Sequence, residues 1–279
     1  MSLPYGMTWF GHGSNRWSDG RLIVDWLCIR AYGSGCSPGA AGGLLPPHLA
    51  IVADEQEEVG QVLPRSQNYA VAGATALSPD ALKQAADVNA ITPDSLDVQV
   101  GWFLHDVMNA SSVGRPAGKG TTLIHLGEIG GDDVNYALRD HMSPLDIRER
   151  IVPRVISTVS QQLDRILSVH LAPAPITRVV IQGQFPMGCM PVYVLEVSAN
   201  ANASSNSSLA PDLDHLGCVS AVNAISDLQN ELLLSTVIPY VAAKYPHVSF
   251  VFLDTSAAYR HILAHAPNFG FSNLNDRVC

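Results

Sequence analysis

The chain has 279 residues, 47% of them hydrophobic and only 15% charged, with a formal net charge of −9. This composition supports a full hydrophobic core and excludes a disordered chain. The acidic balance and the lack of a Lys/Arg-rich cluster argue against nucleic acid or an anionic membrane as a partner. We expect one globular domain over residues 1–279, and a monomer.

No apolar run approaches the roughly 20 residues that a membrane span requires, so we expect no span. The opening residues, Met-Ser-Leu-Pro-Tyr-Gly, contain no basic segment followed by an apolar stretch and therefore predict no signal peptide. The location of the protein stays open on this basis, and the cytoplasm is one alternative.

Four short segments predict β-strands: residues 67–72, 122–126, 178–182 and 247–253. The last three are nearly continuous runs of β-branched or apolar residues. Such runs are typical of parallel strands that are covered on both faces.

Two long helices are expected between these strands, at residues 143–170 and 213–244. Ser143 can cap the first helix, Pro153 can kink it, and Pro239 can break the second. The alternation of strand and helix predicts an α/β protein with a doubly wound sheet, in which sites form at the carboxyl ends of the strands.

Two of the expected strands run into segments that carry candidate site residues. In Asn68-Tyr-Ala-Val-Ala-Gly-Ala-Thr-Ala-Leu77 the strand exits at Gly73, whose backbone N–H can approach a ligand closely. A plain tight turn is the alternative. Gly127-Glu-Ile-Gly-Gly-Asp-Asp133 follows the next strand, and it is either a structural turn or a weak cation site of Asp132 and Asp133.

Three Asn-x-Ser triplets, at Asn109, Asn202 and Asn206, match glycosylation acceptors, which matter only in the secretory pathway. They also arise by chance, so they only hint at a secreted ancestor. The five cysteines, an odd number, leave at least one thiol unpaired within the chain, and in the cytosol all five would be reduced. Because cysteines and histidines lack zinc-site spacing, we expect no metal site.

Further motifs occur in a characteristic order: Pro4-Tyr-Gly-Met-Thr-Trp-Phe10, Arg16-Trp-Ser-Asp-Gly-Arg-Leu-Ile-Val-Asp25, Gly183-Gln-Phe-Pro-Met-Gly-Cys189, Gly217-Cys218 and Asn223. Together with the segments after the strands, they closely resemble the plant GDSL esterase/lipase family over nearly the whole chain. The resemblance implies a three-layer α/β/α, flavodoxin-like fold of the SGNH hydrolase type. It also implies hydrolysis of small-molecule or lipid carboxylic esters, no cofactor, and a secreted, glycosylated protein.

In that family a serine of a Gly-Asp-Ser block near the N-terminus attacks the ester, helped by an Asp-x-x-His pair near the C-terminus. The resemblance assigns Gly73 to the oxyanion hole and places Asp132 where family members carry an asparagine. An amide donates a hydrogen bond, whereas an ionised carboxylate only accepts one and repels an oxyanion. The loss of one such donor costs about two to three orders of magnitude in rate.

The resemblance also implies that both catalytic blocks are absent. In the family the Gly-Asp-Ser block precedes Pro4-Tyr-Gly, and the Asp-x-x-His block follows the segment that ends here at Cys279. We therefore expect a domain truncated at both ends, without the first strand and the C-terminal helix, and a chain that is catalytically inactive. The alternatives are a non-catalytic protein that binds a small ester or lipid, and a gene-fragment product.

Substitutes for the catalytic groups have weaker support. Gly35-Cys-Ser-Pro-Gly39 matches a nucleophile motif at Ser37, but it lies in a Gly/Pro-rich loop instead of between a strand and a helix. Asp212-Leu-Asp-His215 matches Asp-x-x-His but leads into a helix at another place in the chain, so its side chains are expected to be solvated. His125, inside an apolar strand, is expected to be a core residue.

The resemblance implies a disulfide between Cys189 and Cys218, which would tie the loop after one strand to the following helix. Cys279 matches the start of a cysteine pair in the family. Cys28 and Cys36 have no role that the sequence indicates.

Overall fold

The computed structural model describes residues 5–13, 16–32, 44–50, 66–112, 121–169, 171, 174–200 and 212–272. The chain divides into two compact units, residues 1–72 and residues 73–279. A single domain over residues 1–279 stays a prediction.

In the N-terminal unit, helix α1 (Ile23–Tyr32) is anchored by a buried ion pair. The Asp25 carboxylate accepts hydrogen bonds from Arg16, 2.5 Å away, and from the backbone N–H of Leu45, at 2.9 Å. Arg16 also donates to the carbonyl of Leu45. Because both charged groups are paired inside the unit, they hold the start of α1 against the segment at Leu45.

The strand expected at residues 67–72 is wrong. Asn68 makes one isolated parallel bridge, to Pro47, and no ladder continues from it. The side chain of Asn68 accepts a hydrogen bond from the backbone N–H of Ala70, at 3.1 Å. Such a local bond turns the backbone and competes with strand pairing.

The C-terminal unit contains a parallel sheet of three strands in the order β1 (Thr122–Leu126), β2 (Ile176–Gln182) and β3 (Ser249–Leu253). The other three strand predictions are therefore confirmed, and β1 has the expected bounds. Strand β2 begins two residues earlier than expected, and β3 begins two residues later. The register aligns Leu126 with Ile181 and Ile181 with Phe252.

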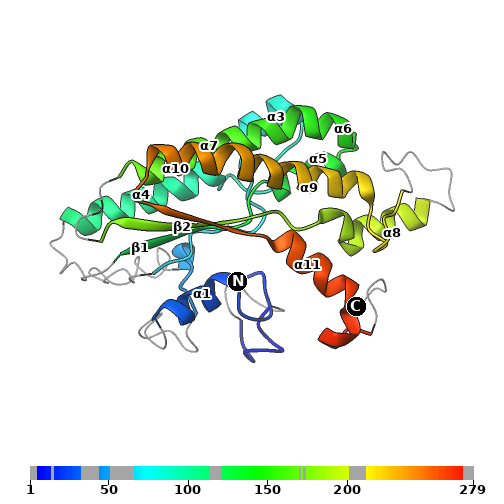
Figure 1. Cartoon of the computed structure of the whole chain (residues 1–279), viewed down its shortest axis with the longest axis horizontal. Coiled ribbons are helices and arrows are strands. Elements are labelled where there is room, and N and C mark those ends of the chain that lie inside the picture. Colours follow the sequence, from blue (N-terminus) through cyan, green and yellow to red (C-terminus); the bar gives the residue numbers. More distant parts are fainter. Residues whose placement is uncertain are drawn as a thin grey trace. The chain divides into compact units, whose positions relative to one another are not determined.

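The sheet is flanked by helices, so the protein has the α/β architecture that the sequence predicts. Helices α7 (Val152–Leu167), α9 (Ser220–Leu232) and α10 (Ile238–Lys244) lie side by side along one face of the sheet (Figure 1). The core between them is apolar, and Val179 and Ile181 at the centre of β2 are fully buried. Burial of such side chains is the main favourable contribution to folding.

Both long helices contain a π-helical turn just before a proline. Segments η2 (Ile147–Ile151) and η4 (Leu233–Val237) directly precede α7 and α10, and Pro153 and Pro239 are the second residues after these turns. Proline has no N–H to donate and crowds the carbonyl one turn back. The wider π turn accommodates both effects, so neither proline ends its helix.

The two helix predictions had different outcomes at their starts. Ser143 caps the first helix, because its hydroxyl accepts a hydrogen bond from the backbone N–H of Asp146 at 3.1 Å, and helix α6 (Pro144–Asp146) continues into η2. The start of the second at residue 213 is wrong, since α9 begins at Ser220. Residues before it form a turn with an antiparallel bridge between Leu213 and Val219.

The remaining described helices connect or follow these elements: α3 (Pro79–Ala86), α4 (Leu96–Ser112), α5 (Gly131–Arg139), η3 (Met187–Cys189), α8 (Pro191–Asn200), α11 (Thr255–Ala264) and η5 (Ala266–Phe269). None of the helices in the described ranges is both long and apolar enough to cross a membrane.

Several sequence predictions concern residues that the structure does not describe. Ser37, Cys36, Cys279, Asn202 and Asn206 lie outside the described ranges. The remaining glycosylation candidate, Asn109, belongs to helix α4.

Candidate functional site

The structure brings together the two segments that the sequence singled out. Gly73 has a left-handed backbone, with φ at +81°, which glycine adopts without strain. Its carbonyl accepts a hydrogen bond of 2.8 Å from the hydroxyl of Tyr136 on α5. A Cβ atom added at Gly73 would lie 3.1 Å from that hydroxyl oxygen. Both the turn and the close approach therefore favour glycine at this position.

Asp133 fastens the segment after Gly73 to the first turn of α5. Its carboxylate is fully buried and accepts hydrogen bonds from the backbone N–H groups of Ala76, at 2.7 Å, and Leu77, at 3.0 Å. These are two backbone donors that the loop would otherwise bury without partners. Asp133 is therefore a positioning residue, and backbone N–H groups engage both of its carboxylate oxygens.

Asp132, its neighbour, has a different environment. It lies in the first turn of α5, where the positive end of the helix dipole stabilises a carboxylate. Its Oδ1 accepts a hydrogen bond of 3.2 Å from Asn135, and Asn135 in turn accepts one of 2.7 Å from the hydroxyl of Tyr193. The family resemblance assigns an amide donor to this position, but the side chain here is an acceptor. It is held by Asn135, which the hydroxyl of Tyr193 on α8 holds in turn.

Two tyrosines beside this carboxylate stay protonated. Burial and, to a smaller extent, the charge of Asp132 raise the pKa of Tyr136 to about 12. The same two causes raise the pKa of Tyr193. Both hydroxyls are therefore hydrogen-bond donors at neutral pH, in agreement with their acceptors, the carbonyl of Gly73 and the side chain of Asn135.

Glu128 lies in the segment between β1 and the first turn of α5. Its Oε1 accepts a hydrogen bond of 3.0 Å from the N–H of Gly131. Burial raises the pKa of Glu128 to about 7, and the charges of Asp132 and Asp133 act in the same direction. A Cβ atom on Gly131 would lie 2.5 Å from this oxygen, and one on Gly130 would lie 2.6 Å from Val155. Packing and a φ of +100° thus require glycine at position 130, whereas a side chain at position 131 would displace the end of Glu128.

We call residues 73–77 and 128–136, which these hydrogen bonds hold together, the frame around α5. Two polar side chains that the sequence did not indicate, Gln184 and Asn230, also support it. Gln184 donates to the carbonyl of Ile129 at 2.7 Å. Asn230 on α9 makes two hydrogen bonds to the backbone of Gln184, accepting from its N–H at 2.7 Å and donating to its carbonyl at 3.1 Å. The exit of β2 is therefore clamped to α9 and to the turn before α5. Gln184 lies within a family motif, which was the only signal available.

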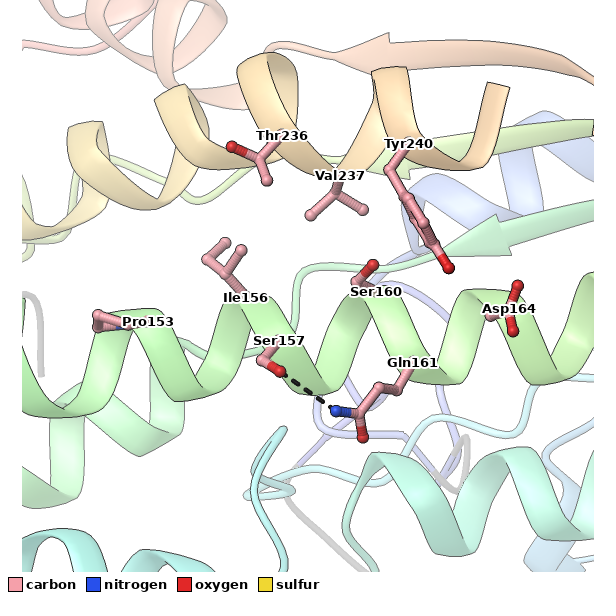
Figure 2. A pocket seen from close by; sticks show the side chains of 9 residues that line it. All are labelled: Pro153, Ile156, Ser157, Ser160, Gln161, Asp164, Thr236, Val237 and Tyr240. Atoms are coloured by element: carbon pink, nitrogen blue, oxygen red, sulfur yellow. Dashed lines mark hydrogen bonds between the residues drawn. The ribbon is translucent and has the colours of Figure 1, made fainter. Parts of the chain in front are cut away.

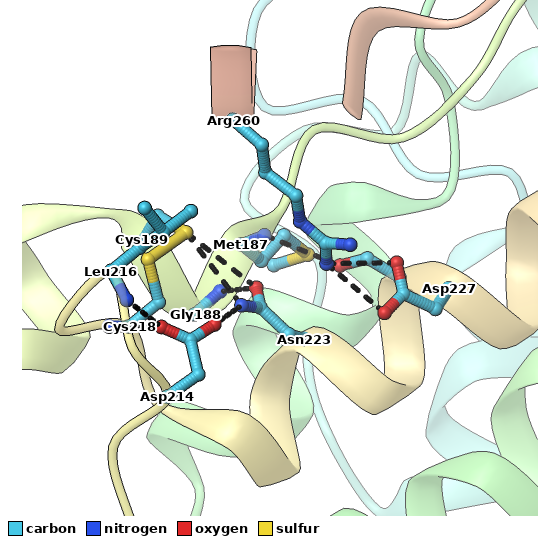
Figure 3. The surroundings of a disulfide bond; sticks show 10 residues. Met187, Gly188, Cys189, Asp214, Leu216, Cys218, Asn223, Asp227 and Arg260 are labelled. Carbon is cyan, nitrogen blue, oxygen red and sulfur yellow. Dashed lines mark hydrogen bonds and ion pairs between the residues drawn. A yellow bond between two sulfur atoms is a disulfide. The ribbon is translucent and has the colours of Figure 1, made fainter. Parts of the chain in front are cut away.

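A disulfide joins Cys189 and Cys218 beside this clamp (Figure 3). Asn223 accepts a hydrogen bond of 2.9 Å from the N–H of Gly188, and Asp214 accepts one of 3.0 Å from the N–H of Cys218. The cross-link and these side chains form the disulfide turn, which we define as residues 187–189 with 212–223. Because this turn occupies residues 212–219, the second long helix begins at Ser220 and not at residue 213.

Comparison with known proteins identifies relatives over the full length of the chain. No family model matches it. A GDSL esterase/lipase of Arabidopsis thaliana is 30% identical over 280 residues, which are 99% of this chain and 62% of the relative. The chain belongs to the plant GDSL esterase/lipase family.

Other GDSL relatives show the same pattern. A second GDSL esterase/lipase of Arabidopsis thaliana is 27% identical over all of this chain and 65% of its own length. Acetylajmalan esterase 2 of Rauvolfia serpentina is 29% identical over all of this chain and 68% of its own length. The chain spans less than two thirds of the length of the first two relatives.

The other candidates for GDSL catalytic groups do not join the site in the described part of the chain. Asp212 and His215 are exposed on the disulfide turn, and Asp214 between them serves that turn. Burial lowers the pKa of His125 in β1, so its ring is neutral at neutral pH. The rings of His12, His48 and His265 make hydrogen bonds to Gly13, Gln67 and His261.

A separate groove of this GDSL relative lies between α7 and the η4–α10 helix (Figure 2), with a volume of about 480 Å³. Its lining consists of Pro153, Ile156, Ser157, Ser160, Gln161, Asp164, Thr236, Val237 and Tyr240. Asp164, its one acidic residue, accepts hydrogen bonds from Lys244 at 2.5 Å and from Tyr245 at 2.8 Å. None of the residues around Gly73 and Asp132 lines this groove.

Proposed function

We propose that the segment at Gly73 and the first turn of α5 bind the carbonyl group of a carboxylic ester, and that this chain is a catalytically incompetent member of its ester hydrolase family. Family membership supports the ester as the ligand class. The observation that carries the proposal is Asp132, a hydrogen-bond acceptor at the position where the family resemblance places an amide donor.

The chemistry of an acyl transfer explains why this position matters. Attack on an ester carbonyl places a negative charge on its oxygen, and donors aimed at that oxygen stabilise the transition state. The backbone N–H of Gly73 is suited to that role. The carboxylate of Asp132 would repel the same oxygen, and the loss of one donor costs about two to three orders of magnitude in rate.

The second candidate is a protein whose function is to bind esters without cleaving them. The buried hydrogen bonds that hold the loop at Gly73 and helix α5 favour it, because they keep the binding segments in place. Asp133, Tyr136 and Gln184 hold the loop and the helix in place through buried hydrogen bonds. Asp132 replaces the amide donor that the family resemblance places at this position, but these supporting hydrogen bonds do not involve it. A protein of this kind would hold a small ester or lipid without cleaving it, and the substrate class is the one that the names of the relatives indicate, with an acetyl ester as the first probe.

We also infer that the sheet and helices belong to a three-layer α/β/α fold of the SGNH hydrolase type. Two observations support this inference: the parallel order of β1, β2 and β3, and the full-length similarity to GDSL esterases.

The decisive experiment is intact-mass measurement of the folded chain after exposure to a fluorophosphonate probe, followed by peptide mapping. We expect no adduct. A stoichiometric adduct would show that a serine is activated, with Ser37 as the first one to inspect, and would contradict the catalytic part of the proposal.

A second experiment tests Asp132 directly with a methylphosphonate monoester, which carries the negative charge that an oxyanion develops. The variant Asp132→Asn is expected to bind it at least about tenfold more tightly than the wild type, because an acceptor becomes a donor. Asp140→Asn removes the same charge from the exposed end of α5 and serves as the matched control. Equal affinities of all three proteins would argue against a carbonyl site at Asp132.

A further inference from the structure

Helix α11 carries a pair of histidines that the ester site does not use. His261 and His265 lie one helical turn apart and therefore on the same face. Both side chains are exposed, and their ring centres are 4.4 Å apart, with the planes tilted by 37°. Helix α11 leads away from the end of β3 (Figure 1). The pair is a distinct feature of the surface of the C-terminal unit.

The protonation of His265 follows from its hydrogen bond. Its Nδ1 lies 3.0 Å from the carbonyl oxygen of His261. A carbonyl oxygen can only accept, so Nδ1 carries the proton and Nε2 of the neutral ring presents a lone pair. Histidines that bind metals are oriented in this way, with one ring nitrogen donating to a carbonyl and the other facing the ion.

The spacing of the two rings suits a chelate. In the square-planar geometry that Cu²⁺ adopts, a metal about 2.1 Å from each of two imidazole nitrogens, with an angle of about 90° between them, places the two ring centres roughly 4.5 Å apart. The observed separation is 4.4 Å. The ring of His261 packs edge-on against Phe269, at 5.9 Å, and makes no hydrogen bond to any described residue. A rotation of this ring can therefore direct a nitrogen toward the ion at little cost.

The local charges also favour a cation. His265 is the C-terminal cap of α11, where the helix dipole is negative. The nearest positive side chain in sequence, Arg260, is engaged with the carboxylate of Asp227 on α9, at 2.9 and 3.0 Å. Its charge is therefore partly neutralised by that pair.

We propose that His261 and His265 form a surface site for a late first-row divalent cation, with Cu²⁺ bound more tightly than Zn²⁺. Imidazole suits both ions, and affinities of nitrogen sites rise toward copper. Among the described residues there is no cluster of three or more metal-binding side chains, so the two imidazoles are the protein ligands and water completes the coordination. Two histidines at this spacing on one helix face are also the arrangement that helical zinc sites use.

The test is a calorimetric titration of the whole chain with Cu²⁺, and separately with Zn²⁺, at pH 7.5 in a buffer that does not bind metals. The wild type is expected to show one equivalent of tight binding. Because a second tethered ligand typically adds 10² to 10⁴ in affinity, His261→Ala and His265→Ala should each weaken it about 100-fold or more. His215→Ala, which removes another exposed histidine, is the matched control and should bind like the wild type.

Electron paramagnetic resonance of the Cu²⁺ complex gives a readout that does not depend on affinity. Hyperfine structure from two imidazole nitrogens is expected in the wild type and from one in either variant. The proposal is overturned if the wild type binds no equivalent of Cu²⁺, or if that equivalent survives in both variants. Circular dichroism of each variant confirms that the exposed substitutions leave the fold intact. None of these outcomes depends on the ester proposal.

Discussion

Two buried polar regions of the C-terminal unit satisfy similar backbone groups by different means. The frame around α5 uses the fully buried carboxylate of Asp133 and the partly buried carboxylate of Glu128 to accept hydrogen bonds from backbone N–H groups. The disulfide turn keeps its carboxylate, Asp214, partly exposed and uses the amide of Asn223 and a covalent cross-link inside. The first region should therefore respond to pH and the second to removal of the disulfide.

The largest effect is expected from Asp133→Ala, which breaks the frame. The substitution leaves the N–H groups of Ala76 and Leu77 buried without acceptors. Each unsatisfied donor costs about 1–3 kcal/mol, so unfolding in urea should show a loss of about 3 kcal/mol or more. The exposed Asp140→Ala is the control and should change stability by less than about 0.5 kcal/mol. A loss below about 1 kcal/mol for Asp133→Ala would refute the role of this carboxylate.

The double variant Cys189→Ala/Cys218→Ala removes the cross-link of the disulfide turn. The disulfide closes a loop with a sequence separation of 29 residues, and a cross-link of this size contributes about 3 kcal/mol. Substitution is preferable to a reductant, because Cys28 is also disulfide-bonded. The urea midpoint should fall, while the pH dependence of stability stays as in the wild type. A change in that pH dependence would mean that the two regions are coupled.

The variant Glu128→Gln should change how the stability of the frame depends on pH. The folded pKa of Glu128, about 7, is above its ordinary value of 4.5. Between these values the folded protein holds a proton that the unfolded chain has released, so stability falls as pH rises from about 4.5 to 7 and is level above. Glu128→Gln should remove about 1–2 kcal/mol of this change, because the side chain is partly exposed to solvent. Urea unfolding at pH 5 and pH 8 measures it, and an unchanged slope would contradict the assignment.

The smallest effect is expected for the difference in stability between Gly73→Ala in the first region and Gly217→Ala in the second. Gly73 and Gly217 have similar backbones, with φ at +81° and +78°. An added Cβ meets the hydroxyl of Tyr136 at Gly73 and nothing within 4 Å at Gly217. Both alanine variants lose about 1 kcal/mol through backbone strain, and Gly73→Ala should lose several tenths more. Thermal unfolding of the two variants measures the difference, and equal losses would show that the contact with Tyr136 carries no energy.

Local sequence patterns predicted much of the fold. The continuous apolar runs at β1, β2 and β3 formed the expected parallel sheet, but burial on both faces holds only for β2, because Leu123 in β1 and Val251 in β3 are exposed. Ser143 capped its helix as expected. The strand expected at residues 67–72 failed because pairing depends on a neighbour that no local pattern reveals: Asn68 pairs with the segment at Pro47, and its side chain then accepts a hydrogen bond from the N–H of Ala70.

For the candidate site, the sequence and its family resemblance singled out Gly73, Asp132 and the motif cysteines as candidates, and they placed Asp133 beside Asp132 without giving it a structural role. Only the tertiary structure decided that Asp133 reaches back more than 50 residues to two N–H groups while Asp132 does not, since such contacts depend on how the chain folds back on itself. The physical reason is range: propensities and caps act within a turn or two, whereas buried hydrogen bonds join whatever segments the packed core brings together.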